Sequence, residues 1–99
     1  PDDVRPRFDV VGKTSKPLPA GTVLDATGHH HQIDGVDGLL VPARAAVGAN
    51  PIPFYLMAGN RLLRDIPAGI VITAEMVEPP KASLLWTLRR EMEAEFGLH

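Results

Sequence analysis

Two segments of this chain are near-copies of each other, and no other feature of the sequence constrains the fold as strongly. Leu18–Leu24 reads LPAGTVL, and Ile66–Ile72 reads IPAGIVI 48 positions later, with the Pro, the Ala and the Gly identical. Proline fits the second position of a type I turn and glycine fits the fourth. The Val-Leu and Val-Ile that follow favour strands. Each copy therefore predicts a turn that leads into a buried strand, and we expect a fold of two related halves.

Length and composition limit the fold further. A chain of 99 residues is long enough for one domain. Nine glycines and ten prolines favour many turns and short elements over a helical bundle. With only five aromatic residues, the core is expected to be aliphatic.

Charge, hydropathy and cysteine content exclude several function classes. The net charge is −2 and the acids and bases are mixed, so the chain lacks the basic footprint of a nucleic-acid-binding protein. No apolar run approaches the roughly 20 residues that span a membrane. The absence of cysteine excludes disulfides and thiolate chemistry. We expect no nucleic-acid or membrane partner and a cytoplasmic location, which fits a chain without cysteine.

Short apolar segments between turn residues predict the strands. Alternation over Arg7–Val11 indicates a half-buried strand, and Leu39–Val41 and Phe54–Met57 are further strand candidates. Residues 1–7 resemble a linker, so we expect a fragment of a longer polypeptide. Residues 8–78 would then form the β domain.

One helix is expected, over residues 83–96, because Pro79-Pro80 breaks the chain before it. Ser83 is a suitable N-cap. Arg89 and Glu93 have the i,i+4 spacing of a helical ion pair.

The helix carries an apolar stripe at helical spacing. Its members are Leu85, Leu88, Met92 and Phe96. The favoured interpretation is that this stripe packs on the sheet. Because Trp86 lies off the stripe, the alternative is that the stripe packs against another domain or a second subunit.

A histidine-rich loop is the most conspicuous candidate ligand site. His29, His30 and His31 precede Asp34, and imidazole and carboxylate groups suit zinc or nickel. Adjacent residues seldom converge on one ion, however, and no second cluster supplies the remaining ligands. We therefore expect a solvated loop without a metal, and keep His29, His31 and Asp34 as candidates for binding another ligand.

A second candidate site follows the predicted strand at Phe54–Met57. Asn60, Arg61 and Arg64 could reach a phosphate or carboxylate group, for which Arg offers bidentate contacts. The favoured alternative is that the arginines form surface ion pairs, for example Arg64 with Asp65 or Glu75. No residue is expected to be catalytic.

The segment Arg64–Val77, which contains the second copy of the repeat, resembles the signature of SAF domains. These domains are named for sialic acid synthase, type III antifreeze protein and a flagellar assembly chaperone. The resemblance implies a mainly β fold, the β-clip, with an internal pseudo-two-fold repeat of short strands, here followed by one C-terminal helix.

A narrower resemblance extends from about Val10 to Phe96. The segments 11–14, 33–38 and 54–63 and the surroundings of Leu85-Trp86 are similar to the C-terminal part of bacterial homoserine-dehydrogenase-like oxidoreductases, including a branch similar to deoxyxylulose-phosphate reductoisomerase. The resemblance implies an accessory module that assembles the enzyme or caps its active site. Its partners would be the upstream domain of the parent chain and further copies in a homo-oligomer.

We expect no cofactor in this chain itself, because it contains no strand–Gly-x-Gly-x-x-Gly–helix unit. NAD(P) would bind the upstream domain of the suspected parent. The alternative function is a module that binds a small ligand such as a sugar or a sugar acid.

Overall fold

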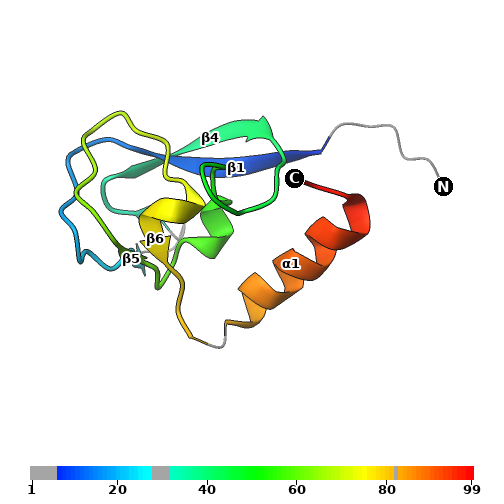
Figure 1. Cartoon of the computed structure of the whole chain (residues 1–99). Coiled ribbons are helices and arrows are strands. Elements are labelled where there is room, and N and C mark those ends of the chain that lie inside the picture. Colours follow the sequence, from blue (N-terminus) through cyan, green and yellow to red (C-terminus); the bar gives the residue numbers. More distant parts are fainter. Residues whose placement is uncertain (1–6, 28–31, 82) are drawn as a thin grey trace.

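Two small antiparallel sheets and one C-terminal helix form the fold of the computed structural model, which describes residues 7–27, 32–81 and 83–99 (Figure 1). The larger sheet has the strand order β1-β4-β3-β2, and the smaller sheet pairs β5 with β6. The strands are β1 (Phe8–Thr14), β2 (Ala26–Thr27), β3 (Gln32–Ile33), β4 (Val36–Pro42), β5 (Arg61–Leu62) and β6 (Val77–Glu78). Two 3₁₀ helices, η1 (Phe54–Leu56) and η2 (Ala74–Met76), precede the helix α1 (Leu84–Phe96). The expected mainly β fold with one C-terminal helix is confirmed.

The two copies of the repeat pair with each other. Leu18 and Ile66 occupy equivalent positions and exchange both backbone hydrogen bonds, at 2.9 and 2.8 Å. The same 48-residue shift relates two flanking hydrogen bonds of 2.8 Å, from Ile72 N to Gly12 O and from Leu24 N to Asn60 O. The bridges Lys13–Val71 and Arg61–Val23 are related in the same way. Each of these contacts thus has an equivalent in which the two halves change roles, so the hydrogen bonds between the halves are arranged symmetrically.

The halves differ by one insertion. Thr14 pairs with Val36 in β1–β4, and the equivalent Leu62 pairs with Val77 in β5–β6. Val36 follows Thr14 by 22 residues, whereas Val77 follows Leu62 by 15 residues. The seven additional residues of the first half accommodate the hairpin of β2 and β3, which has no counterpart in the second half.

The buried core lies between the two halves and consists of aliphatic side chains, as the composition predicted. Both repeat copies contribute to it, and Trp86 of α1 closes one side. Its largest fully buried apolar side chains include Leu24, Ile52, Leu56, Met57, Leu62 and Ile72.

The turns of the repeat differ in detail from the expected type I turn. Thr22 N donates to Pro19 O at 3.2 Å, so the proline is the first residue of the turn and Gly21 is the third. The φ of Gly21 is 87°, a value that this position of a type II turn requires and that glycine adopts without strain. In the second copy, the buried Thr14 hydroxyl bridges the turn, since it accepts from Ile70 N at 2.9 Å and donates to Pro67 O at 2.7 Å.

The strand predicted at Phe54–Met57 is wrong, because this segment forms η1. Leu56 N donates to Pro53 O and Met57 N to Phe54 O, both at 3.0 Å. The Asn60 side chain then donates to the carbonyl groups of Leu56 and Met57. These local hydrogen bonds satisfy backbone groups that a strand would present to a neighbouring strand. The strands predicted at Arg7–Val11 and Leu39–Val41 lie within β1 and β4 except for Arg7.

The helix starts and ends as expected, but it packs through a different face. Ser83 caps it by accepting a hydrogen bond from Trp86 N. The prediction that the apolar stripe covers the sheet is wrong, because Leu85 and Leu88 are about half exposed and Phe96 is 43% exposed. The buried face consists of Trp86, Arg89 and Glu93. Within the described residues, no helix has the length and apolar character needed to cross a bilayer.

We predict that Thr14→Val lowers the free energy of unfolding by about 1–3 kcal/mol, because it leaves the buried turn at Pro67 without its bridging hydroxyl. Thr22→Val is the matched control, since the Thr22 hydroxyl bonds to Pro19 O at an exposed position. Urea denaturation of both variants measures the difference. Equal, small losses would contradict the structural role of Thr14.

Candidate functional site

Arg61 and Arg64, predicted as possible anion ligands, lie at the surface near β6 and η2. The guanidinium of Arg61 is 3.2 Å from the carboxylate of Glu78, and both side chains are more than half exposed. Arg64 donates to the backbone carbonyl of Glu75 at 3.4 Å. Arg61 thus has a surface ion pair, whereas Arg64 contacts the backbone of Glu75 and, within the described residues, forms no ion pair with Asp65 or Glu75.

Asn60 does not accompany the two arginines, because its side chain is fully buried. Its amide nitrogen donates to the carbonyl groups that end η1, and its Oδ1 has no hydrogen-bond partner within the described residues. The asparagine therefore stabilises a turn of the chain. Its position directly after Ala58-Gly59 was a sequence signal for this role, because asparagine side chains commonly bond to the backbone of turns.

Asp34, a candidate ligand residue beside the histidine-rich loop, lies at the turn between β3 and β4. Its carboxylate is 2.6 Å from the Lys16 ammonium group, and its side chain is 85% exposed. His29 and His31 lie outside the described residues. Within the residues that the structure does describe, no three His, Cys, Asp or Glu side chains form a group that could hold a metal ion.

Two open hollows flank the turn that contains Asp34. The larger, of about 450 Å³, lies between the first repeat copy and the hairpin insertion, where Lys16, Thr22, Asp25 and Asp34 contribute its polar groups. The second, of about 400 Å³, lies along residues 32–38 and Phe54. The two hollows share Ile33 and Asp34 in their walls.

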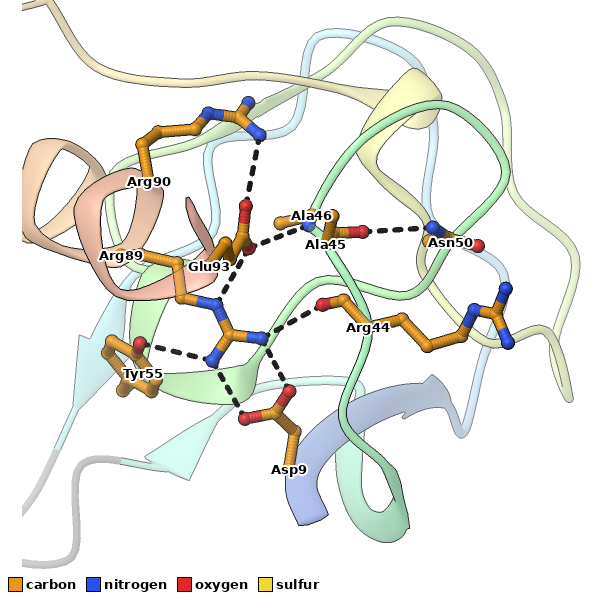
Figure 2. Close-up of polar contacts among 9 residues, drawn as sticks. All are labelled: Asp9, Arg44, Ala45, Ala46, Asn50, Tyr55, Arg89, Arg90 and Glu93. Atoms are coloured by element: carbon orange, nitrogen blue, oxygen red, sulfur yellow. Dashed lines mark hydrogen bonds and ion pairs between the residues drawn. The ribbon is translucent and has the colours of Figure 1, made fainter. Parts of the chain in front are cut away.

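The most strongly organised polar site of the described residues was missed by the sequence analysis. It is centred on the buried Arg89 of α1 (Figure 2). The guanidinium makes a bidentate contact with Asp9 of β1, through Nη1–Oδ1 at 2.9 Å and Nη2–Oδ2 at 2.6 Å. Nη2 also donates to Arg44 O at 2.9 Å, and Nε donates to Glu93 at 2.8 Å.

Glu93 links this group to the irregular segment that follows β4. Its Oε2 accepts from Arg89 and also from the buried Ala46 N at 2.8 Å, while Arg90 approaches its Oε1 to 3.6 Å (Figure 2). A buried ion pair is stable only when its remaining polar atoms are also hydrogen-bonded. Here, the carboxylates and backbone groups meet that requirement.

Burial by itself lowers the pKa of Arg89, but hydrogen bonds to Asp9, Glu93 and Tyr55 more than reverse this effect and raise the pKa above its usual value. Because the folded-state pKa is the higher one, the stabilisation is complete below the unfolded-state pKa and is lost only as the pH rises through the folded-state value. The guanidinium is therefore charged at every pH at which the chain is ordinarily folded.

This cluster joins α1 to β1 and to the segment that follows β4. The guanidinium is enclosed by protein acceptors, namely the carboxylates of Asp9 and Glu93, the carbonyl oxygen of Arg44 and, at 3.5 Å, the Tyr55 hydroxyl. Sequence spacing indicated the Arg89–Glu93 pair. It could not indicate Asp9, which lies 80 residues away along the chain.

Two apolar surfaces remain uncovered in the described structure. The first, here the outer sheet face, consists of Phe8, Val10, Leu40 and Pro42, of which the first three are 52%, 49% and 64% exposed. Val10 pairs with Leu40 and Phe8 with Pro42 across β1 and β4, so their side chains share one face. The second, here the helix stripe, consists of Leu84, Leu85, Leu88 and Phe96, which are 43–68% exposed.

The outer sheet face and α1 lie on opposite sides of β1. Successive residues of a strand alternate between the two faces of its sheet. Asp9, which binds Arg89, and Val11, which is 1% exposed, therefore point away from Phe8 and Val10.

No protein-family model matches the chain, and no curated protein matches it.

We predict that Arg89→Met lowers the free energy of unfolding by about 3–5 kcal/mol, because it removes the buried guanidinium that pairs with the largely buried Asp9 and the buried Glu93. Arg90→Met is the matched control, since Arg90 is half exposed and its pair with Glu93 is long. Denaturation followed by the fluorescence of Trp86, the single tryptophan of the chain, reports the loss of helix packing. Similar losses for both variants would refute the central role of Arg89.

Proposed function

We propose that this chain is an accessory, non-catalytic module that docks on a neighbouring domain through its outer sheet face. The neighbouring domain would belong to a larger NAD(P)-dependent oxidoreductase of the homoserine-dehydrogenase-like kind, with the nucleotide bound outside this chain. Within that assembly, the module holds domains together or covers the active site. The observation that supports this function best is the uncovered apolar face of β1 and β4.

The physical argument starts from the cost of exposing this face to water. Phe8, Val10 and Leu40 are large side chains about half or more exposed, and they adjoin one another across two paired strands. Contiguous apolar patches of this kind mark interaction surfaces. Burying each side chain fully would contribute about 1.5–3 kcal/mol before the cost of association is subtracted.

The resemblance to SAF domains supports the same proposal. The β-clip assignment rests on the Pro-Ala-Gly signature and on the related halves, whose equivalent backbone groups bond to each other at Leu18 and Ile66. A fold with these internal contacts provides a rigid module whose two outer surfaces are available for neighbouring domains.

The coding sequence upstream of Pro1 provides a first test. We expect it to contain a strand, a Gly-x-Gly-x-x-Gly segment and a helix, which form the phosphate-binding unit of dinucleotide-binding domains. An upstream sequence without any nucleotide-binding unit would refute the oxidoreductase assignment while leaving the docking face testable.

A second test uses the full-length protein with Val10→Asp and Leu40→Asp in the outer sheet face. A buried charge at this face opposes docking, so we expect faster proteolytic cleavage between the module and the rest of the protein, together with lower activity. Leu63→Asp is the control, because Leu63 is 54% exposed and lies outside this face. Unchanged proteolysis and activity for both β1–β4 variants would overturn the docking proposal.

The hollow beside the first repeat copy supports a second candidate function, the binding of a sugar or sugar acid. Its polar groups include the ammonium group of Lys16 and the hydroxyl of Thr22, which suit a carboxylate and sugar hydroxyls. Isothermal titration with polyols and sugar phosphates tests this function. A dissociation constant below about 1 mM that Lys16→Met weakens would favour it, and no heat at higher concentrations would reject it.

A further inference from the structure

One side of α1 has the pattern of a short helix-pairing seam. Leu84, Leu88 and Met92 follow one another at intervals of four residues and therefore lie along one side of α1. Leu84 and Leu88 are 68% and 51% exposed, while Met92 is intermediate. Because the Arg89 cluster (Figure 2) holds another side of α1 against the β domain, rotation of α1 cannot bury this seam within the chain.

Opposite charges lie at the two ends of the seam. Lys81 lies in the turn that precedes α1, ahead of the N-cap Ser83, and Glu95 lies in the last turn of α1, seven residues after Leu88. Seven residues are close to two helical turns, so Glu95 lies on the same side of α1 as Leu88. Both charged side chains are exposed, and neither has an ion-pair partner in the part of the chain that the structure describes.

We propose that this seam binds a second copy of the chain, with the two α1 helices antiparallel and Leu88 on the two-fold axis. In this arrangement, Leu84 opposes Met92 of the partner subunit, and Lys81 opposes Glu95 of the partner subunit. The symmetry repeats each contact, as in any isologous dimer. The proposal rests on the proposed function, to which it adds a partner, and it uses a surface distinct from the outer sheet face.

The charge distribution favours this occupant and orientation. An antiparallel pair centred on Leu88 brings each terminal charge of the seam against its opposite, while a parallel pair places Lys81 beside Lys81 of the partner subunit. The N-terminal end of α1 also favours a nearby carboxylate, and in the antiparallel pair Glu95 of the partner subunit lies at that end.

The length of α1 limits the affinity. Thirteen residues extend about 20 Å, so a helix pair alone buries less than the roughly 1,600 Å² of a standard stable interface. We therefore expect a dimer that forms reversibly with concentration, with a dissociation constant in the micromolar range or weaker.

A charge-exchange experiment tests the pairing with the isolated chain by analytical ultracentrifugation between about 10 µM and 1 mM, a range chosen for weak association. Lys81→Glu places Glu opposite Glu95 of the partner subunit in its homodimer, and Glu95→Lys places two lysines together. A mixture of the two variants restores both opposite-charge pairs. We expect each variant alone to dimerise about tenfold more weakly than the mixture at low salt, with the difference reduced at high salt.

Leu88→Asp provides the apolar arm of the test, with Leu63→Asp as the control. Leu88→Asp should abolish the dimer, and Leu63→Asp should leave it unchanged. Because Leu88 is exposed, the variant should retain its circular dichroism spectrum and its free energy of unfolding, which would exclude misfolding as the cause.

Three outcomes would overturn the proposal. They are a monomer throughout the concentration range, a dimer that Leu88→Asp leaves intact, and a mixture that associates no better than its components. If the chain is monomeric and α1 binds an upstream domain, the partner of the seam is that domain and not a second copy. None of these outcomes depends on the outer sheet face, so docking through Val10 and Leu40 is tested independently.

Discussion

The reciprocal pairing of Leu18 with Ile66 is the contact on which the arrangement of the chain depends. Two backbone hydrogen bonds join equivalent residues, and the bonds on either side are related by the same shift along the sequence. The described strands outside the β1–β4 pair contain two residues each and could not be stable alone. Reciprocal contacts between the halves supply the partners that such short segments lack, which explains how a chain rich in proline and glycine forms an ordered core.

The Arg89 cluster has a different role, because it joins a helix to a β domain that is otherwise complete. A purely apolar contact would have tolerated several orientations of α1, since apolar packing has no directional preference. Only one orientation of α1 allows Arg89 to make its bidentate contact with Asp9 together with its bonds to Glu93 and Arg44 O (Figure 2). The orientation selected directs Trp86 into the core and leaves the helix stripe in water. The polar cluster is thus the reason that α1 presents a potential binding surface.

The pairing of the repeat copies and the Arg89 cluster form the scaffold of the molecule, as distinct from its candidate binding surfaces. The duplicated segments are turns and bridges that bury their side chains or bond their backbone within the fold. The uncovered features lie where the halves differ or end: the hollow beside the hairpin insertion, the outer face of β1 and β4, and the exposed stripe of α1. The arginines at positions 61 and 64 are engaged in surface contacts, and Asn60 belongs to the scaffold.

The sequence by itself determined the local elements: the two repeat copies, the turn at each Pro-Ala-Gly, the strand segments in β1 and β4, and the cap and extent of α1. Propensity, capping and residue spacing act over a few residues and are therefore visible in one sequence. Only the tertiary structure decided that Phe54–Met57 turns into a 3₁₀ helix closed by Asn60, and that the repeat copies bond to each other. It also decided which face of α1 is buried. The apolar stripe predicted a different face, because periodicity shows that a helix has an apolar side but does not reveal a buried cation whose partner, Asp9, lies 80 residues away.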